Sequence, residues 1–306
     1  MYKEFYKFKE MPFTLTPNTQ FFFNRHSHRE ALNTMLLALR HSEGFIKIVG
    51  EVGTGKTLLC RKLLSLLDGH LMTVYIPNPY LTPAELKAVV AEELGIRSEL
   101  NIPAYKLPGI IYRRLIQLAR LGKQVVLVID EAQAMPRETI ESLRLLTNLE
   151  TERRKLLQVV LLGQPELDVL LNRPDLRQLK QRIVFSERLR PFSAKGTAHY
   201  VRHRLLAAGC TAELFSGGAL RLLAFASGGT PRLINILAHK GLLAAYGRGD
   251  QQVKASHLAR AVADTEESRW QGKLLAWRWR LLAPVAGAFL LLVAALPFNS
   301  LLRGLL

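Results

Sequence analysis

The chain has 306 residues, of which 49% are hydrophobic and 22% charged. This length allows two domains, and the composition disfavours wholesale disorder, collagen-like structure and a multi-span membrane protein. Its 42 Lys and Arg residues outnumber its 25 Asp and Glu residues, which gives a formal net charge of +17. A basic balance of this size indicates a polyanionic partner, namely phosphate, nucleic acid or anionic lipid.

The N-terminus and the cysteines argue against a secreted protein and against a fold held by disulfides or bound metal. The opening residues MYKEFYKFKEMPF lack the apolar run of a secretory signal, so we expect the chain to begin in the cytoplasm. Cys60 and Cys210 form neither a disulfide framework nor a metal-binding pattern. We expect both to be packing residues in a reducing compartment.

The first 190 residues alternate short β-branched runs with longer helical patterns, which predicts a parallel sheet covered by helices. The expected strands are 45–49, 71–76, 124–129, 156–162 and 182–189. The runs VVLVI and VVLL show no polar alternation, so we expect these strands to be buried on both faces. Helical patterns alone follow from 191 to 265, which predicts a smaller α-helical domain.

A complete phosphate-loop motif, GEVGTGKT, stands at residues 50–57 between the first strand and the next helix. Its glycines permit a tight turn in which backbone N–H groups and a helix N-terminus face an anion. We expect Lys56 to reach the β- and γ-phosphates of ATP, and the Thr57 hydroxyl to bind Mg²⁺. The predicted nucleotide-binding residues of the loop are Gly50, Glu51, Val52, Gly53, Thr54, Gly55, Lys56 and Thr57.

The strand at 124–129 is followed directly by two carboxylates, Asp130 and Glu131. Polar groups at the carboxyl ends of parallel strands face the ligand crevice of such a sheet. We expect Asp130 to hold Mg²⁺, directly or through water, and Glu131 to be the general base for the attacking water. The two motifs together predict ATP hydrolysis, with ATP and Mg²⁺ as the bound species.

Further polar residues are candidates for contact with the nucleotide. Gln164 follows the fourth strand directly, where it would meet the γ-phosphate and the water. Asn148 competes for this role, and either residue can instead cap a helix or a turn. Arg232, in GTPR at 229–232, begins a helix of the second domain and is expected to reach the nucleotide from there.

These features together resemble an AAA+ ATPase: a phosphate loop, a DE strand end, a polar residue after the next strand, and GTPR in a helical lid. The segments PFTLTPNTQFFF, HREAL, DEAQ and LLGQPEL further resemble the secretion-associated ATPase family typified by ExeA. The resemblance covers residues 1 to about 264. It implies a three-layer αβα nucleotide-binding core at 1–190 and an α-helical lid at 191–265.

The resemblance also implies a ring-forming homo-oligomer that serves secretion or pilus assembly at the bacterial inner membrane. In such rings a neighbouring subunit supplies an arginine to each site from near the last core strand. Arg177 and Arg182 match that region, and we favour Arg182, the alternative being a solvated basic face. His26 and His28 lie where the resemblance would place adenine contacts.

The C-terminal region changes character after Glu267, the last acidic residue. A linker at 266–280, rich in cations and tryptophan, precedes residues 281–302, which carry no ionisable side chain. As a helix, this apolar run would measure roughly 33 Å, enough for a hydrocarbon core of about 30 Å. We predict a single transmembrane helix with the ATPase domain in the cytoplasm, the alternative being a buried terminal helix of a soluble domain.

Two other functions remain open at this point. The basic stretch from 173 to 204 suits a DNA-dependent AAA+ ATPase of the transposition-regulator or loader type, because basic patches bind phosphate backbones. Nucleic acid is nevertheless the less favoured partner, since no separate DNA-reading motif is present and such an ATPase has no need of a membrane span. A non-hydrolysing nucleotide switch is the third possibility, and it would not require Glu131.

Overall fold

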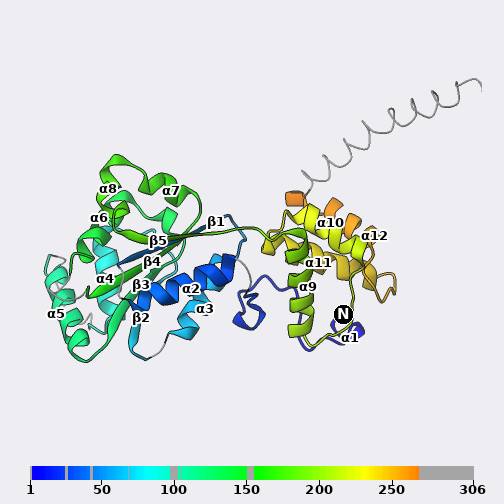
Figure 1. Cartoon of the computed structure of the whole chain (residues 1–306), viewed down its shortest axis with the longest axis horizontal. Helices are drawn as coiled ribbons and strands as arrows, with labels where there is room; N and C mark the ends of the chain where they lie inside the picture. The colour runs from blue at the N-terminus through cyan, green and yellow to red at the C-terminus, as the bar shows by residue number, and fades with distance from the viewer. Residues whose placement is uncertain are drawn as a thin grey trace, which may run out of the picture. The chain divides into compact units, whose positions relative to one another are not determined.

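The computed structural model describes residues 2–24, 27–41, 44–67, 69–96, 103, 105–149 and 155–268. The chain divides into two compact units (Figure 1). The core unit comprises residues 14–192 together with 230–232. The helical unit comprises residues 1–13, 193–229 and those from 233 onward.

The core unit is built on a five-stranded parallel sheet with the strand order β2-β3-β4-β1-β5. The strands are β1 (Phe45–Gly50), β2 (Leu71–Ile76), β3 (Gln124–Ile129), β4 (Leu157–Gly163) and β5 (Ile183–Leu189). All five predicted strands are confirmed, with bounds that shift by no more than one residue. Arg182 precedes β5 rather than beginning it.

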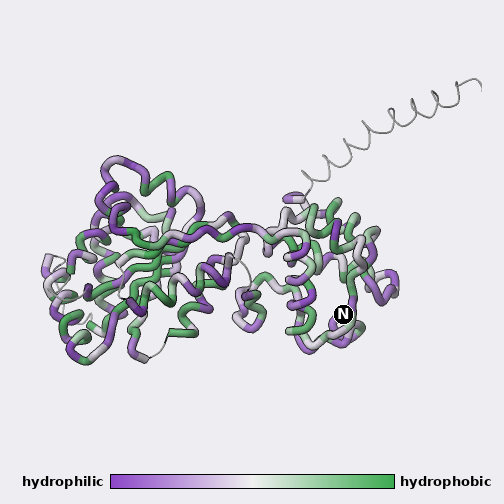
Figure 2. The backbone as a smooth tube through the Cα atoms, in the orientation of Figure 1, coloured by the Kyte–Doolittle hydropathy of each residue, from purple (hydrophilic) through white to green (hydrophobic). Residues whose placement is uncertain are grey.

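Helices cover both faces of the sheet. The side chains of α2 (Ser27–Arg40) and α3 (Lys56–Leu66) share one apolar cluster with Val126 and Val128 of β3. Those of α4 (Pro83–Glu93), α5 (Leu107–Arg120) and α6 (Arg137–Leu146) share the other with Val125 and Leu127. Successive β3 side chains therefore enter opposite layers. This confirms that the strand is buried on both faces, and Figure 2 shows the hydrophobic residues of the core unit concentrated along the sheet.

Shorter elements complete the core unit. They are the 3-10 turns η1 (Thr19–Phe21), η2 (Ala132–Ala134) and η3 (Pro174–Leu176), and the helices α7 (Glu166–Leu171) and α8 (Arg177–Lys180). The turn η2 directly follows the two carboxylates after β3, whereas α7 follows β4 and Gln164. Both elements therefore position the predicted site. Cys60 is buried in the α2–α3 layer and has a free thiol, as expected for a packing residue.

The helical unit contains α9 (Ala194–Ala207), α10 (Gly217–Ser227), α11 (Pro231–Tyr246) and α12 (Ala255–Ala263), as well as the short α1 (Tyr2–Phe5). Residues 2–13 belong here, so the predicted boundary of the nucleotide-binding core at residue 1 is wrong for this segment. The reason is aromatic burial: the Tyr2 hydroxyl lies 2.7 Å from Nδ1 of His239, and the Tyr6 hydroxyl donates to the Asp250 carbonyl at 2.9 Å. Such long-range packing leaves no local sequence signal.

The predicted C-terminal segments fall largely outside the described residues. Of the linker at 266–280, only 266–268 are described, and the predicted transmembrane helix at 281–302 lies wholly beyond them. Within the part of the chain that the structure describes, no helix combines the length and apolar character needed to cross a bilayer.

Candidate nucleotide site

The predicted site residues meet at one edge of the sheet. Because the strands are parallel, β1, β3 and β4 all end at the same edge, and β4 lies between the other two. The phosphate loop follows β1, Asp130 follows β3, and Gln164 follows β4. The chain thus brings distant segments to the carboxyl-terminal edge, where parallel sheets bind ligands.

The phosphate loop, residues 50–57, adopts a conformation that depends on glycine. Gly53 and Gly55 have φ angles of +77° and +96°, in the region that only glycine enters without strain. The Thr54 hydroxyl donates to the Glu51 carbonyl at 2.7 Å and braces the turn. Gly55 is the N-cap of α3, so the unpaired N–H groups of the first helical turn belong to the loop. This arrangement favours an anion such as phosphate.

Lys56 is buried at the centre of the loop, with 4% of its surface exposed. Its Nζ donates to the carbonyls of Gly50 at 2.8 Å and Glu51 at 3.2 Å. Burial lowers the pKa of this amine, whereas the nearby carboxylates of Glu131 and Asp130 act in the opposite direction. Because its hydrogen-bond partners are neutral carbonyls, the buried cation is available to pair with an anion.

Thr57 and Asp130 form the candidate magnesium site. The Thr57 hydroxyl donates to Oδ2 of Asp130 at 2.8 Å, and the Glu131 backbone N–H donates to Oδ1 at 2.9 Å. Burial raises the pKa of the Asp130 carboxyl, although both of these hydrogen bonds oppose the shift. A hydroxyl and one carboxylate fit Mg²⁺, which keeps several waters and binds few protein oxygens. Within the described ranges, no group of three or more His, Cys, Asp or Glu side chains offers an all-protein cage.

Glu131 is held by two glutamine side chains. Its backbone is left-handed, with φ of +50°, a conformation uncommon for a residue other than glycine. Its Oε2 accepts hydrogen bonds from Nε2 of Gln133 at 2.6 Å and from Nε2 of Gln164 at 3.0 Å. Burial alone would raise the pKa of this carboxyl, but these two bonds and the charge of Lys56 outweigh it and lower the pKa. Glu131 is therefore an anion at neutral pH, as a base must be.

Gln133 is a site residue that the sequence reasoning missed. Besides its bond to Glu131, its Oε1 accepts the backbone N–H of Gln164 at 2.9 Å, so it links the ends of β3 and β4. The only signal for it was its place in the DEAQ segment, two residues after Glu131.

The structure brings Gln164, but not Asn148, to Glu131. Asn148 is exposed after the end of α6, beside Thr147, whose hydroxyl accepts a hydrogen bond from Arg182. Arg182 precedes the first residue of β5, at the amino-terminal edge of the sheet. Asn148 therefore lies at the edge opposite the phosphate loop.

Arg232 lies beside the phosphate loop. The Arg232 backbone N–H donates to the Gly53 carbonyl at 3.1 Å. A Cβ built on Gly53 would stand 2.7 Å from the Cβ of Arg232. Residues 230–232 belong to the core unit, although α11, which begins at Pro231, otherwise belongs to the helical unit. Gly53 is thus required both for its backbone angle and for this close approach.

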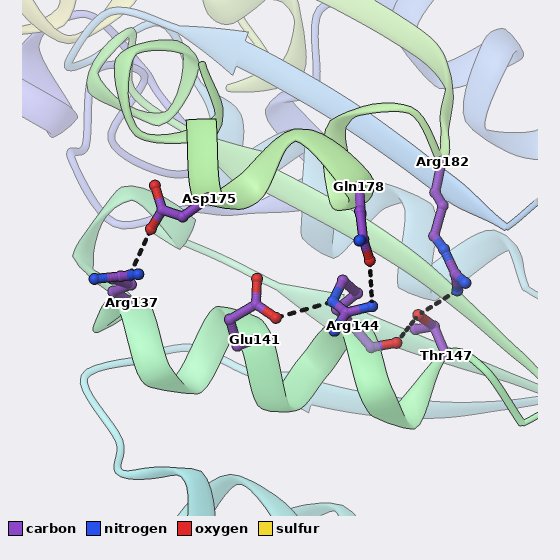
Figure 3. Close-up of polar contacts among 7 residues, drawn as sticks. All are labelled: Arg137, Glu141, Arg144, Thr147, Asp175, Gln178 and Arg182. Carbon is purple, nitrogen blue, oxygen red and sulfur yellow. Dashed lines mark hydrogen bonds and ion pairs between the residues drawn. The ribbon is translucent and has the colours of Figure 1, made fainter. Parts of the chain in front are cut away.

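Arg182, directly before the last strand, lies at the amino-terminal edge of the sheet, beside the end of α6 (Figure 3). Arg182 donates through Nη1 to the Thr147 hydroxyl at 3.4 Å, whereas the Arg177 side chain is exposed. The six residues of β1 span about 20 Å between this edge and the phosphate loop. Arg182 therefore cannot meet the phosphate loop of its own chain.

Other charges in this region are paired within the chain. Along α6, Arg137 pairs with Asp175, while Arg144 pairs with Glu141 at 2.9 Å and donates to Gln178 at 2.8 Å (Figure 3). These contacts join α6 to the 174–180 segment. Within the basic stretch itself, Arg173 contacts Asp175 at 3.4 Å and Lys180 donates to Asn172 at 2.6 Å, so part of its charge is paired within the chain.

Comparisons with known proteins agree with this geometry. Residues 39–171 match the family model of an AAA domain. General secretion pathway protein A from Aeromonas hydrophila is 39% identical over 290 residues, which are 95% of this chain and 52% of that protein. The chain thus spans about half the length of the curated relative that it matches.

Three solved structures of low sequence identity have a similar fold. Cdc6p from Pyrobaculum aerophilum has a TM-score of 0.64 and 18% identity, covering 83% of this chain and 70% of that chain. ORC1 from Aeropyrum pernix, in complex with DNA, has a TM-score of 0.60 and 19% identity, covering 83% and 69%. RuvB from Thermotoga maritima, a Holliday junction branch migration motor, has a TM-score of 0.53 and 16% identity, covering 77% and 68%. The core unit therefore has the AAA+ P-loop α/β fold with a parallel sheet.

Proposed function

We propose that this chain is an AAA+ ATPase that hydrolyses ATP to ADP and phosphate with Mg²⁺ as its cofactor. The observation that carries the proposal is the Glu131 carboxylate, ionised and held by Gln133 and Gln164 at the sheet edge that also presents Lys56. A protein that only binds nucleotide has no need of a carboxylate oriented in this way. The AAA domain match supports the same conclusion.

Each residue of the site has a distinct task in the proposed reaction. The loop amides and Lys56 bind the phosphate chain, while Thr57 and Asp130 hold Mg²⁺, which when bound neutralises charge that develops on the phosphate oxygens. Glu131 accepts the proton of the attacking water. Gln164, which donates to the same carboxylate, is proposed to orient this water rather than Asn148.

Nucleotide binding tests the first part of the proposal. We expect Lys56→Ala to weaken MgATP binding about 100-fold, because hydrogen bonds to a charged group contribute up to about 3 kcal/mol. Titration with a fluorescent ATP analogue measures this loss. The matched control is Lys62→Ala on the same helix, which should bind as the unsubstituted protein does. Equal affinity in Lys56→Ala and the control would contradict the assignment of the phosphate loop.

We further propose that the ATPase acts at the bacterial inner membrane in pilus biogenesis of the type IV, mannose-sensitive haemagglutinin kind, or in type II-like secretion. The 39% identity to General secretion pathway protein A supports a role in secretion. The segments HREAL, DEAQ and LLGQPEL also resemble MshM, the ATPase of that pilus system. The membrane proposal rests on residues 281–302 as a single transmembrane helix, preceded by the basic linker.

The alternative is a DNA-dependent ATPase, which the exposed cations Arg173, Arg177 and Lys180 favour. One experiment separates the two proposals: capture of partners on Glu131→Gln protein, trapped with ATP, from membranes washed in alkaline carbonate. We expect the protein to stay with the membranes and to retain inner-membrane pilus or secretion proteins. Complete release by carbonate would refute the transmembrane helix, and recovery of DNA in place of such proteins would favour the alternative.

A further inference from the structure

We infer that His28 is a positioning residue that fixes the phosphate loop in its anion-binding conformation by holding the carbonyl of Thr54. This inference rests on the proposed function, because it concerns the same loop. His28 is the second residue of α2, far in sequence from the motif, and its side chain is 5% exposed. Its Nε2 lies 2.7 Å from the Thr54 carbonyl oxygen.

The chemistry of this contact defines the state of the imidazole. A carbonyl oxygen can only accept, so Nε2 of His28 carries the proton and donates it. Burial lowers the pKa of His28, although the bond to Thr54 opposes this shift, so the ring is neutral at physiological pH. In this tautomer Nδ1 carries no proton, and among the described residues it has no hydrogen-bond partner. Among the described residues, the His28 ring therefore makes its hydrogen bond through Nε2, to Thr54.

Holding the Thr54 carbonyl also sets the direction of the next backbone donor. The peptide unit between Thr54 and Gly55 is planar and trans, so its C=O and N–H groups point in opposite directions. With the carbonyl directed at His28, the Gly55 N–H is directed away from it. Gly55, at φ of +96°, has little intrinsic preference for this orientation, and its N–H makes no hydrogen bond within the described part of the chain. The histidine thus keeps one loop donor available for phosphate.

Aromatic packing keeps the imidazole in place. The His28 ring lies against the ring of Phe192, with centroids 5.4 Å apart, and Phe192 meets Phe23 edge-on at the same separation. All three side chains are buried. A Cβ built on Gly55 would stand only 3.5 Å from Nε2, so the ring packs closely against the back of the loop. His28 is therefore fixed on one side by aromatic rings and on the other by the loop that it orients.

The test compares substitutions that keep or remove the donor at Nε2. Glutamine places its amide nitrogen near the position of Nε2, asparagine places it near Nδ1, and leucine has no donor. We expect His28→Leu and His28→Asn to bind MgADP and tripolyphosphate about tenfold more weakly, because the phosphate-binding amide loses its orientation. His28→Gln should bind both within about twofold of the unsubstituted protein. His41→Leu, on an exposed residue just beyond the end of α2, is the matched control.

Tripolyphosphate is the decisive probe because it has no base. If His28→Leu weakened ADP binding but left tripolyphosphate binding unchanged, the residue would contact adenine and the inference would be wrong. Equal loss in the glutamine and leucine variants would also overturn it, since a packing role alone would then suffice. Failure of the unsubstituted protein to bind either probe would refute the proposed function itself. Thermal unfolding of each variant without nucleotide shows which of them fold.

Discussion

Substitution of Glu131 by glutamine is expected to lower ATP turnover by about 10²- to 10⁴-fold while MgATP binding is retained, because general-base catalysis contributes rate enhancement of that size. The amide is nearly the same size as the carboxylate but cannot accept the proton of water. Lys56, Thr57 and Asp130, which are proposed to bind the nucleotide, are unchanged. Steady-state phosphate release and equilibrium ATP binding, measured on the same preparation, separate the two effects.

The matched control for this variant is Glu138→Gln, an exposed carboxylate at the start of α6. Glu138→Gln should keep full turnover, and unimpaired turnover in Glu131→Gln as well would exclude Glu131 as the base.

The pH dependence of turnover adds a second readout of the role of Glu131. Since the pKa of Glu131 is lowered, the base is ionised above that value and is lost only as the pH falls through it. Gln164→Leu removes a bond that lowers this pKa, so turnover should begin to fall at a higher pH.

Substitution of Arg182 by alanine is expected to lower the turnover of the assembled protein by about 10³-fold or more, the effect of removing an arginine finger supplied in trans. The physical reason is the distance across the sheet: Arg182 stands at the amino-terminal edge, about 20 Å from its own phosphate loop. It can therefore complete only the site of a neighbouring subunit. Because Arg182 also donates to Thr147, Thr147→Val serves as the control for a merely structural role.

Mixing two inactive variants tests the role in trans directly. Lys56→Ala chains keep Arg182, and Arg182→Ala chains keep Lys56, so heterologous interfaces in mixed assemblies contain some complete sites. We expect roughly a quarter of full turnover from a random equal mixture, in which one interface in four joins the two intact parts. No recovery in assemblies shown to be mixed would count against Arg182. Loss of turnover in Arg177→Ala but not in Arg182→Ala would transfer the role to Arg177.

Local sequence patterns predicted the positions of the strands in this protein but not their order in the sheet. The strands at 45–50 and 124–129 could be predicted because apolar β-branched runs bounded by turn residues form strands almost regardless of context. Their order in the sheet could not be predicted in the same way. It depends on β4 lying between β1 and β3, a choice made by packing between segments far apart in the chain.

The same division applies to the candidate site. The sequence by itself determined which groups could bind phosphate and Mg²⁺ and accept a proton, because the loop motif at 50–57 and the pair Asp130–Glu131 are contiguous and follow strands. Only the tertiary structure decided that Gln164 and Gln133, and not Asn148, meet Glu131. Asn148 precedes β4 and Gln164 follows it, so the two residues lie at opposite edges, and the pairing of β4 with β3 brings Gln164 to Glu131.

The tertiary structure likewise decided which loop residues His28 and Arg232 contact, and to which unit residues 2–13 belong. His28 and Arg232 contact the phosphate loop at Thr54 and Gly53, and residues 2–13 bury their aromatic side chains in the helical unit. Covalent neighbours dictate helix, strand and turn, because those structures depend on backbone angles and short-range hydrogen bonds. The partners of a buried side chain depend on which distant surfaces exclude water together, and that is determined only when the whole chain packs.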